Sequence, residues 1–108
     1  MPNINQVALS GRIVQTPVRS TSEKGTRFSA RIAASRSYRD DQDHWQEDVS
    51  FFDIIVQGKL AEHFAERLSK GTPVFITGRL KSRPNSEVNG VKIDVRNLQI
   101  LESDPGND

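Results

Sequence analysis

The stretch VSFFDIIVQGKLAEHFAERLSKGTPVFITGRL, residues 49–80, decides the fold because its hydrophobic period changes twice. Apolar and polar residues alternate in residues 49–57 and again in 72–80, which predicts a strand at each end. Between them, residues 59–71 repeat apolar side chains every three to four positions, which is typical of an amphipathic helix. The side of the first strand that we expect to face the core carries Phe52, Ile54 and Val56.

Three further stretches outside this unit alternate in the same way and are predicted to be strands. They are residues 6–14, 27–34 and 91–101. The first of them contains Gly11, which predicts a bulge or a sharp bend. The helix of the central unit should end at Gly71, which suits a left-handed cap, because Pro73 prevents continuation. The polar stretch 36–48 between the second and third strands is expected to be a long loop or a hairpin.

Five strands with one helix between the third and the fourth match the oligonucleotide-binding (OB) fold, an all-β barrel in which the helix closes one end. An isolated α+β sandwich with the same element order is the alternative that the pattern leaves open. A chain of 108 residues has room for one such domain. We place the barrel domain at residues 1–101 and a short acidic tail at residues 102–108.

Composition excludes several classes of protein. The chain has no cysteine, which excludes a disulfide framework and thiolate-based metal or redox chemistry. We see no charged-then-apolar leader and no long apolar run, so we expect a cytoplasmic, nucleoid-associated protein without a membrane partner. The net charge is only +1, but three of the 14 acids and none of the 15 bases lie beyond residue 101. The barrel domain is therefore expected to be moderately basic.

Cations recur at every second residue around the end of the fourth predicted strand, at Arg79, Lys81 and Arg83. Residues two apart on an extended segment point to the same side, so these three cations should line one side. Arg27 and Arg31 share one face of the second strand in the same way. A groove that tracks the phosphates of single-stranded DNA needs such cations. The alternative is an ordinary solvated sheet face.

Aromatic side chains in polar surroundings supply the second requirement of such a groove, a flat surface on which bases stack. The only tyrosine, Tyr38, has Arg36 and Arg39 beside it and is our first candidate. The only tryptophan, Trp45, either stacks on a base or packs back against the barrel. Phe51 lies opposite the core side of its strand and should be exposed. The other phenylalanines are expected in the core or in a subunit interface: Phe28, Phe52, Phe64 and Phe75.

Several segments resemble the bacterial single-stranded DNA-binding protein (SSB) family. They are NQVALSGRIVQTPVRS at 5–20, GKLAE at 58–62 and KG-x-x-V-x-I-x-GRL at 70–80, and the resemblance covers nearly all of residues 5–101. Asn5, Tyr38 and Phe51 occupy positions that match the family pattern. The resemblance implies sequence-tolerant binding and protection of single-stranded DNA in replication, repair or recombination. It also implies a homo-oligomer, either a tetramer or a dimer, with replication or repair proteins as further partners.

The chain departs from the family pattern in three places. Gln57 stands where members often have an aromatic residue, and a stacking tryptophan is missing near Asn85. We therefore expect weaker binding or a shorter footprint. The chain ends at SDPGND rather than in a long linker with a protein-recruiting tip. A short relative, the primosomal replication protein N, shares the opening LSGRIVQTPVRS, so a replication-restart protein that binds single-stranded DNA and partner proteins is the alternative function.

Two other classes of function are compatible with parts of the sequence. The segment DDQDH places Asp40, Asp41, Asp43 and His44 together, as a metal nuclease or hydrolase would require. No glycine turns the chain there, so we expect no metal site, no cofactor and no catalytic residue. A pure protein-interaction module is also compatible with the fold. The cations and exposed aromatic residues favour DNA binding instead.

Overall fold

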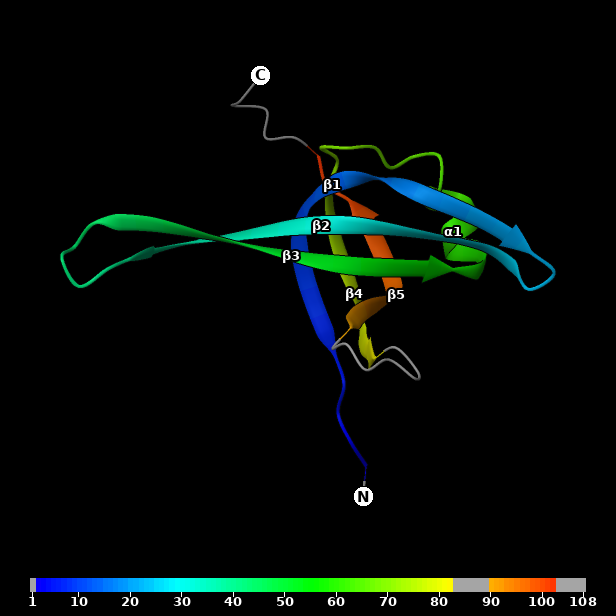
Figure 1. Cartoon of the computed structure of the whole chain (residues 1–108), viewed down its shortest axis with the longest axis horizontal. Helices are drawn as coiled ribbons and strands as arrows, with labels where there is room; N and C mark the ends of the chain where they lie inside the picture. The colour runs from blue at the N-terminus through cyan, green and yellow to red at the C-terminus, as the bar shows by residue number, and fades with distance from the viewer. Residues whose placement is uncertain (1, 83–89, 103–108) are drawn as a thin grey trace.

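The computed structural model describes residues 2–82 and 90–102. In this part of the chain, five strands close into a barrel in the order β1-β2-β3-β5-β4 (Figure 1). The elements are β1 (Val7–Ser22), β2 (Gly25–Arg39), β3 (Trp45–Gln57), α1 (Gly58–Phe64), β4 (Pro73–Ser82) and β5 (Val91–Ile100). The predicted all-β OB barrel is confirmed, and the α+β sandwich is wrong because the sheet closes on itself.

Strand β1 closes the barrel because it pairs with two different strands. Its first half, Val7–Arg12, pairs with β4, and the rest of the strand pairs with β2. Gly11 lies where the partner changes, and a Cβ atom there would collide with the carbonyl oxygen of Ala33 on β2. The register is regular at Gly11 and shifts only after Ile13. The predicted bulge at Gly11 is therefore wrong, whereas the predicted bend fits the change of partner from β4 to β2. This glycine allows β1 and β2 to approach closely.

Strands β2 and β3 form one long antiparallel ribbon that projects from the barrel (Figure 1). Pairing is continuous from Arg27 opposite Gln57 to Arg39 opposite Trp45. Only residues 40–44 remain outside the two strands. Of the two structures predicted for residues 36–48, the hairpin is correct and the long loop is wrong.

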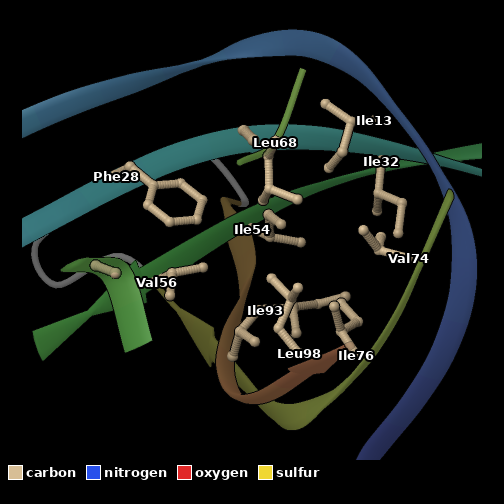
Figure 2. Close-up of a cluster of buried hydrophobic side chains, with 13 residues drawn as sticks. Ile13, Phe28, Ile32, Ile54, Val56, Leu68, Val74, Ile76, Ile93 and Leu98 are labelled. Atoms are coloured by element: carbon tan, nitrogen blue, oxygen red, sulfur yellow. The ribbon is translucent and has the colours of Figure 1, made fainter. Parts of the chain in front are cut away.

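The core lies between the inner sides of all five strands (Figure 2). The largest fully buried side chains are Phe28, Ile13, Ile32, Ile54, Ile76, Val56 and Val74. Burying a side chain of this size stabilises the fold by about 1.5–3 kcal/mol. Of the four phenylalanines expected in the core or in a subunit interface, Phe52 and Phe75 lie outside this core and are each 37% exposed. Phe52 shares the side of β3 with Ile54 and Val56 but borders an open hollow lined by residues of β1, β2 and β3, so its predicted place in the core is wrong. The alternative, a subunit interface, stays a prediction.

The helix is shorter than its sequence period predicts. It ends at Phe64, and Leu68 is buried in the core beyond the helix. Gly71 has a φ of 97°, as a left-handed residue should, but it caps no helix. Its N–H donates to the carbonyl of Ile13, at 2.6 Å. This bond ties the segment to β1, which a helix continuing to Gly71 could not do. None of the helices in the described residues is long and apolar enough to cross a membrane.

Candidate nucleic-acid interface

One side of the barrel, directed away from the core, gathers residues from four strands into a single surface. Ser29 pairs with Ile55, Ile55 with Asp94, and Asp94 with Arg79, so these residues form one row across β2, β3, β5 and β4. Paired residues point to the same side of a sheet, as do residues two positions away. We call this surface the outer face. It comprises Arg27, Ser29, Arg31, Phe51, Asp53, Ile55, Gln57, Arg79, Lys81, Lys92, Asp94 and Arg96.

The outer face is positively charged. It contains six basic side chains and only two acidic ones, Asp53 and Asp94. Arg27 and Arg31 are both exposed, as the sequence predicts. Arg79 and Lys81 lie on the same side of β4, also as predicted. Arg83, the third cation of the predicted triplet, lies outside the described residues.

Two of the basic side chains lie beside a single carboxylate, Asp94, at the β4–β5 end of this face. Arg79 Nε donates to Asp94 Oδ2 at 3.1 Å, and Arg96 Nη2 lies 3.8 Å from the same oxygen. Lys81 stands directly opposite Lys92 across the two strands. Like charges in this position destabilise a sheet, and a bound anion would offset that cost. A hollow of about 370 Å³ lies beside these groups.

Sequence reasoning missed Lys92 and Arg96 as members of this surface. Their alternation with Val91, Ile93 and Val95 was visible in the sequence, and it placed them on the polar side of the last strand. What the sequence did not show is that β5 pairs in parallel with β3 and antiparallel with β4. That pairing brings the two cations beside those of β4.

Two of the three aromatic candidates share one side of the ribbon. Phe51 is 52% exposed, as predicted, and Trp45 is 66% exposed, so the prediction that Trp45 could pack back against the barrel is wrong. Both lie on β3 at positions of the same parity, six residues apart, which corresponds to roughly 20 Å along a strand. Trp45 therefore lies on the same side of β3 as Phe51, nearer the tip of the ribbon.

Tyr38 lies on the opposite side of the ribbon. Its strand parity is that of the buried residues Phe28 and Ile32, whereas Arg39, the next residue along, is paired with Trp45. The structure therefore does not bring Tyr38 together with Phe51. A DNA strand that lies on the outer face can reach Tyr38 only by passing round the ribbon.

Each of these rings has an arginine over it. Within the described residues, the guanidinium carbon of Arg31 lies 5.2 Å from the centroid of the Phe51 ring. The corresponding distance is 5.1 Å from Arg36 to Tyr38 and 5.0 Å from Arg39 to Trp45. Distances under about 6 Å are typical of cation–π contacts.

The acidic residues at the ribbon tip organise the turn. Asp40 Oδ1 accepts hydrogen bonds from the backbone N–H groups of His44 and Gln42, each at 2.9 Å. The bond from His44 is the largest of the causes that lower the pKa of the Asp40 carboxyl below its usual value. Asp43 pairs with Arg39 at 2.8 Å. Within the described residues, no group of three His, Asp or Glu side chains is arranged to hold a metal ion.

Comparison with known proteins assigns the chain to a family. The profile of the single-strand binding protein family matches residues 4–102. The chain belongs to this family. Single-stranded DNA-binding protein 2 of Chlorobaculum tepidum is 37% identical over 110 residues, which cover 94% of this chain and 73% of that protein. The single-stranded DNA-binding protein of Aquifex aeolicus is 31% identical over 108 residues, which cover 95% of this chain and 74% of that protein. The predicted SSB resemblance is confirmed.

Solved structures of SSB proteins share the fold. The small single-stranded DNA-binding protein from Streptomyces coelicolor superposes with a TM-score of 0.79 at 24% identity, covering 99% of this chain and 98% of that one. The Plasmodium falciparum SSB, solved in complex with single-stranded DNA, superposes with a TM-score of 0.81 at 20% identity, covering 94% and 98%.

The structure also shows what Asn5, the residue that matches the start of the SSB family pattern, does in the barrel. The side-chain amide of Asn5 donates to the carbonyl of Leu80 and accepts from its N–H, both at 2.8 Å. Val7 pairs with Gly78, so Asn5 lies in register with Leu80. The side chain thus makes the two hydrogen bonds of one further ladder pair. In this chain the role of Asn5 is to extend the contact between β1 and β4.

Proposed function

We propose that this SSB-family chain binds single-stranded DNA along the outer face, with little sequence preference, and protects it during replication, repair or recombination. The observation that carries the proposal is the continuity of the surface. Cations from β2, β4 and β5 lie on one side of the barrel, and the exposed rings of Phe51 and Trp45 follow along the ribbon. Charge and flat rings are the two things that a sequence-tolerant binder of single strands requires.

The proposed mechanism is passive. Five basic side chains of the outer face contact phosphates and release counterions from the DNA. Arg27, Lys81 and Lys92 do so freely, whereas phosphate competes with the Asp94 carboxylate for Arg79 and Arg96. Phe51 and Trp45 stack on unpaired bases. This stacking does not depend on the sequence, because every base has a flat face. The DNA is released by salt or by a competing strand. The proposal includes no catalytic residue, no cofactor and no metal ion, and it places the protein in the cytoplasm with the DNA.

The test is to measure binding to labelled oligo-dT, to a blunt duplex of equal length and to the matching RNA at two salt concentrations. The single strand should bind more tightly than the duplex, because paired bases offer no free face. Its affinity should fall linearly with salt on logarithmic axes. Equal affinity for single strand and duplex, or no response to salt, would contradict the proposed function.

We also propose that the chain is a homo-oligomer, either a dimer or a tetramer. Apart from the side that carries the outer face, Phe51 and Trp45, several large apolar side chains are more than a third exposed: Phe52, Phe75, Leu80 and Ile100. Exposed apolar surface of this kind is typical of subunit interfaces. Light scattering at tens of micromolar should give two or four times the mass of the chain, whereas a monomer would contradict this part of the proposal.

A further inference from the structure

The arginines that lie over the aromatic rings differ from the other cations of the interface. Arg31, Arg36 and Arg39 each lie within 5.2 Å of a ring centroid. No such contact is found for Arg27 or Arg79 in the described part of the chain. Three separate residues on one ribbon therefore repeat the same arrangement, in which a flat cation covers one face of a flat ring.

Two of these three guanidinium groups already have an acidic partner. Arg36 Nη2 lies 3.3 Å from Asp48 Oδ2, and Arg39 Nη1 lies 2.8 Å from Asp43 Oδ1. A carboxylate partner competes with phosphate for the guanidinium, as Asp94 does for Arg79. What sets Arg36 and Arg39 apart from Arg79 is that each also lies over a ring.

Covering one face of a ring has a direct consequence for base stacking. The guanidinium leaves only the other face free, so each ring can stack one base rather than lie between two. It also restricts the side-chain rotation of the ring before DNA arrives. Because immobilising a side chain costs conformational entropy on binding, a ring that is already held loses less when the base stacks.

We propose that Arg31, Arg36 and Arg39 are positioning residues for base stacking, which act through their flat guanidinium groups and not by neutralising phosphates. This inference rests on the proposed function and deepens it. Each arginine–ring pair would support one unpaired base on its open side. Arg31 and Phe51 would do so on the outer face, and Arg39 and Trp45 farther along the same side. Arg36 and Tyr38 would do so on the other side of the ribbon.

Arginine-to-lysine variants separate the two roles, because lysine keeps the positive charge but has no flat group to lie over a ring. We expect Arg31→Lys and Arg39→Lys to weaken binding of oligo-dT by about two- to five-fold, the range expected for an exposed cation–π contact. The slope of log affinity against log salt should not change. Arg67→Lys is the control: Arg67 is exposed just beyond the helix, outside both the outer face and the ribbon, and this variant should bind like the parent.

A second measurement does not depend on DNA binding. Trp45 is the only tryptophan, so its fluorescence reports on one ring. Arg39→Lys should make Trp45 more accessible to a neutral quencher such as acrylamide in the free protein, because one face of the ring becomes uncovered. Arg36→Lys, which acts on Tyr38, should leave this signal as in the parent.

Three results would overturn the inference. The first is that Arg31→Lys and Arg39→Lys bind oligo-dT as tightly as the Arg67→Lys control. The second is a loss of affinity accompanied by a smaller salt slope, because this would mean that the arginines contact phosphates. The third is quenching of Trp45 that does not change in Arg39→Lys. If the parent protein itself fails to bind oligo-dT, the proposed function fails, and that outcome differs from all three.

Discussion

Asp94 offers the sharpest test of how charge is used on the outer face. Its side chain is 14% exposed, and its Oδ2 lies 3.1 Å from Arg79 Nε and 3.8 Å from Arg96 Nη2. A carboxylate in this position competes with DNA phosphate for the same donors. We therefore expect Asp94→Asn to bind single-stranded DNA more tightly at low salt. Asparagine keeps an oxygen that can accept from Arg79, so the change removes charge more than contact.

The magnitude follows from the number of arginines that become available. Each phosphate contact on a single strand adds about 0.7 to the slope of log affinity against log salt. If only Arg79 gains a phosphate, the advantage of the variant over the parent should shrink about three-fold between 50 and 200 mM salt. If Arg96 gains one as well, it should shrink about seven-fold over that range.

The assay is a fluorescence-anisotropy titration of labelled oligo-dT at several salt concentrations. Glu66→Gln is the matched control: it removes the same charge from another arginine pair, in which Arg19 Nη1 lies 3.1 Å from Glu66 Oε1, away from the outer face. Weaker binding by Asp94→Asn at low salt, with the slope unchanged, would refute the reasoning and indicate that Asp94 positions Arg79. An equal gain in the control would indicate an effect of net charge alone.

Three further predictions address stacking, folding and pH. In short oligo-dT, Phe51→Ala should cost about 1–3 kcal/mol of binding free energy for a stacked base; Tyr38→Ala should cost less, because Tyr38 lies on the other side of the ribbon, and an equal loss would contradict this geometry. Gly78→Ala should lower the free energy of unfolding by about 1–3 kcal/mol in chemical denaturation, because its Cβ would collide with a carbonyl oxygen of β5. The pKa of Asp40 is lowered in the folded chain, so its stabilisation of the ribbon turn is present above the normal carboxyl pKa of 3.8 and is lost as pH falls through the lower folded value; the NMR signal of the His44 amide should shift in that acidic range and not near neutral pH.

The order of the elements could be predicted from the sequence because each signal is local. Alternation with a period of two marks the strands, and the change to a helical period after Gln57 marks the single helix. The ends of the elements are predicted less accurately than their order. The apolar period continues to Leu68, but the helix stops at Phe64, because Leu68 enters the core outside the helix. Packing against other strands overrode the local helical preference there.

The exposure of individual strand residues was also largely predictable. Phe51 is exposed and Ile54 is buried, as their opposite parity implies. Phe52 shares the parity of Ile54 and yet is 37% exposed. Parity determines the side of a strand to which a residue points, but it does not determine whether another part of the chain covers that side.

The sequence by itself thus determined the five strands, the one helix and the side on which most strand residues lie, because these depend on neighbours along the chain. Only the tertiary structure decided which cations share a surface and which rings they cover. Lys92 joins Arg79 through the pairing of β4 and β5, and Tyr38 is separated from Trp45 by the register of the ribbon. Strand pairing and register are set by core packing and by turns between distant segments, so no local pattern in the sequence contains them.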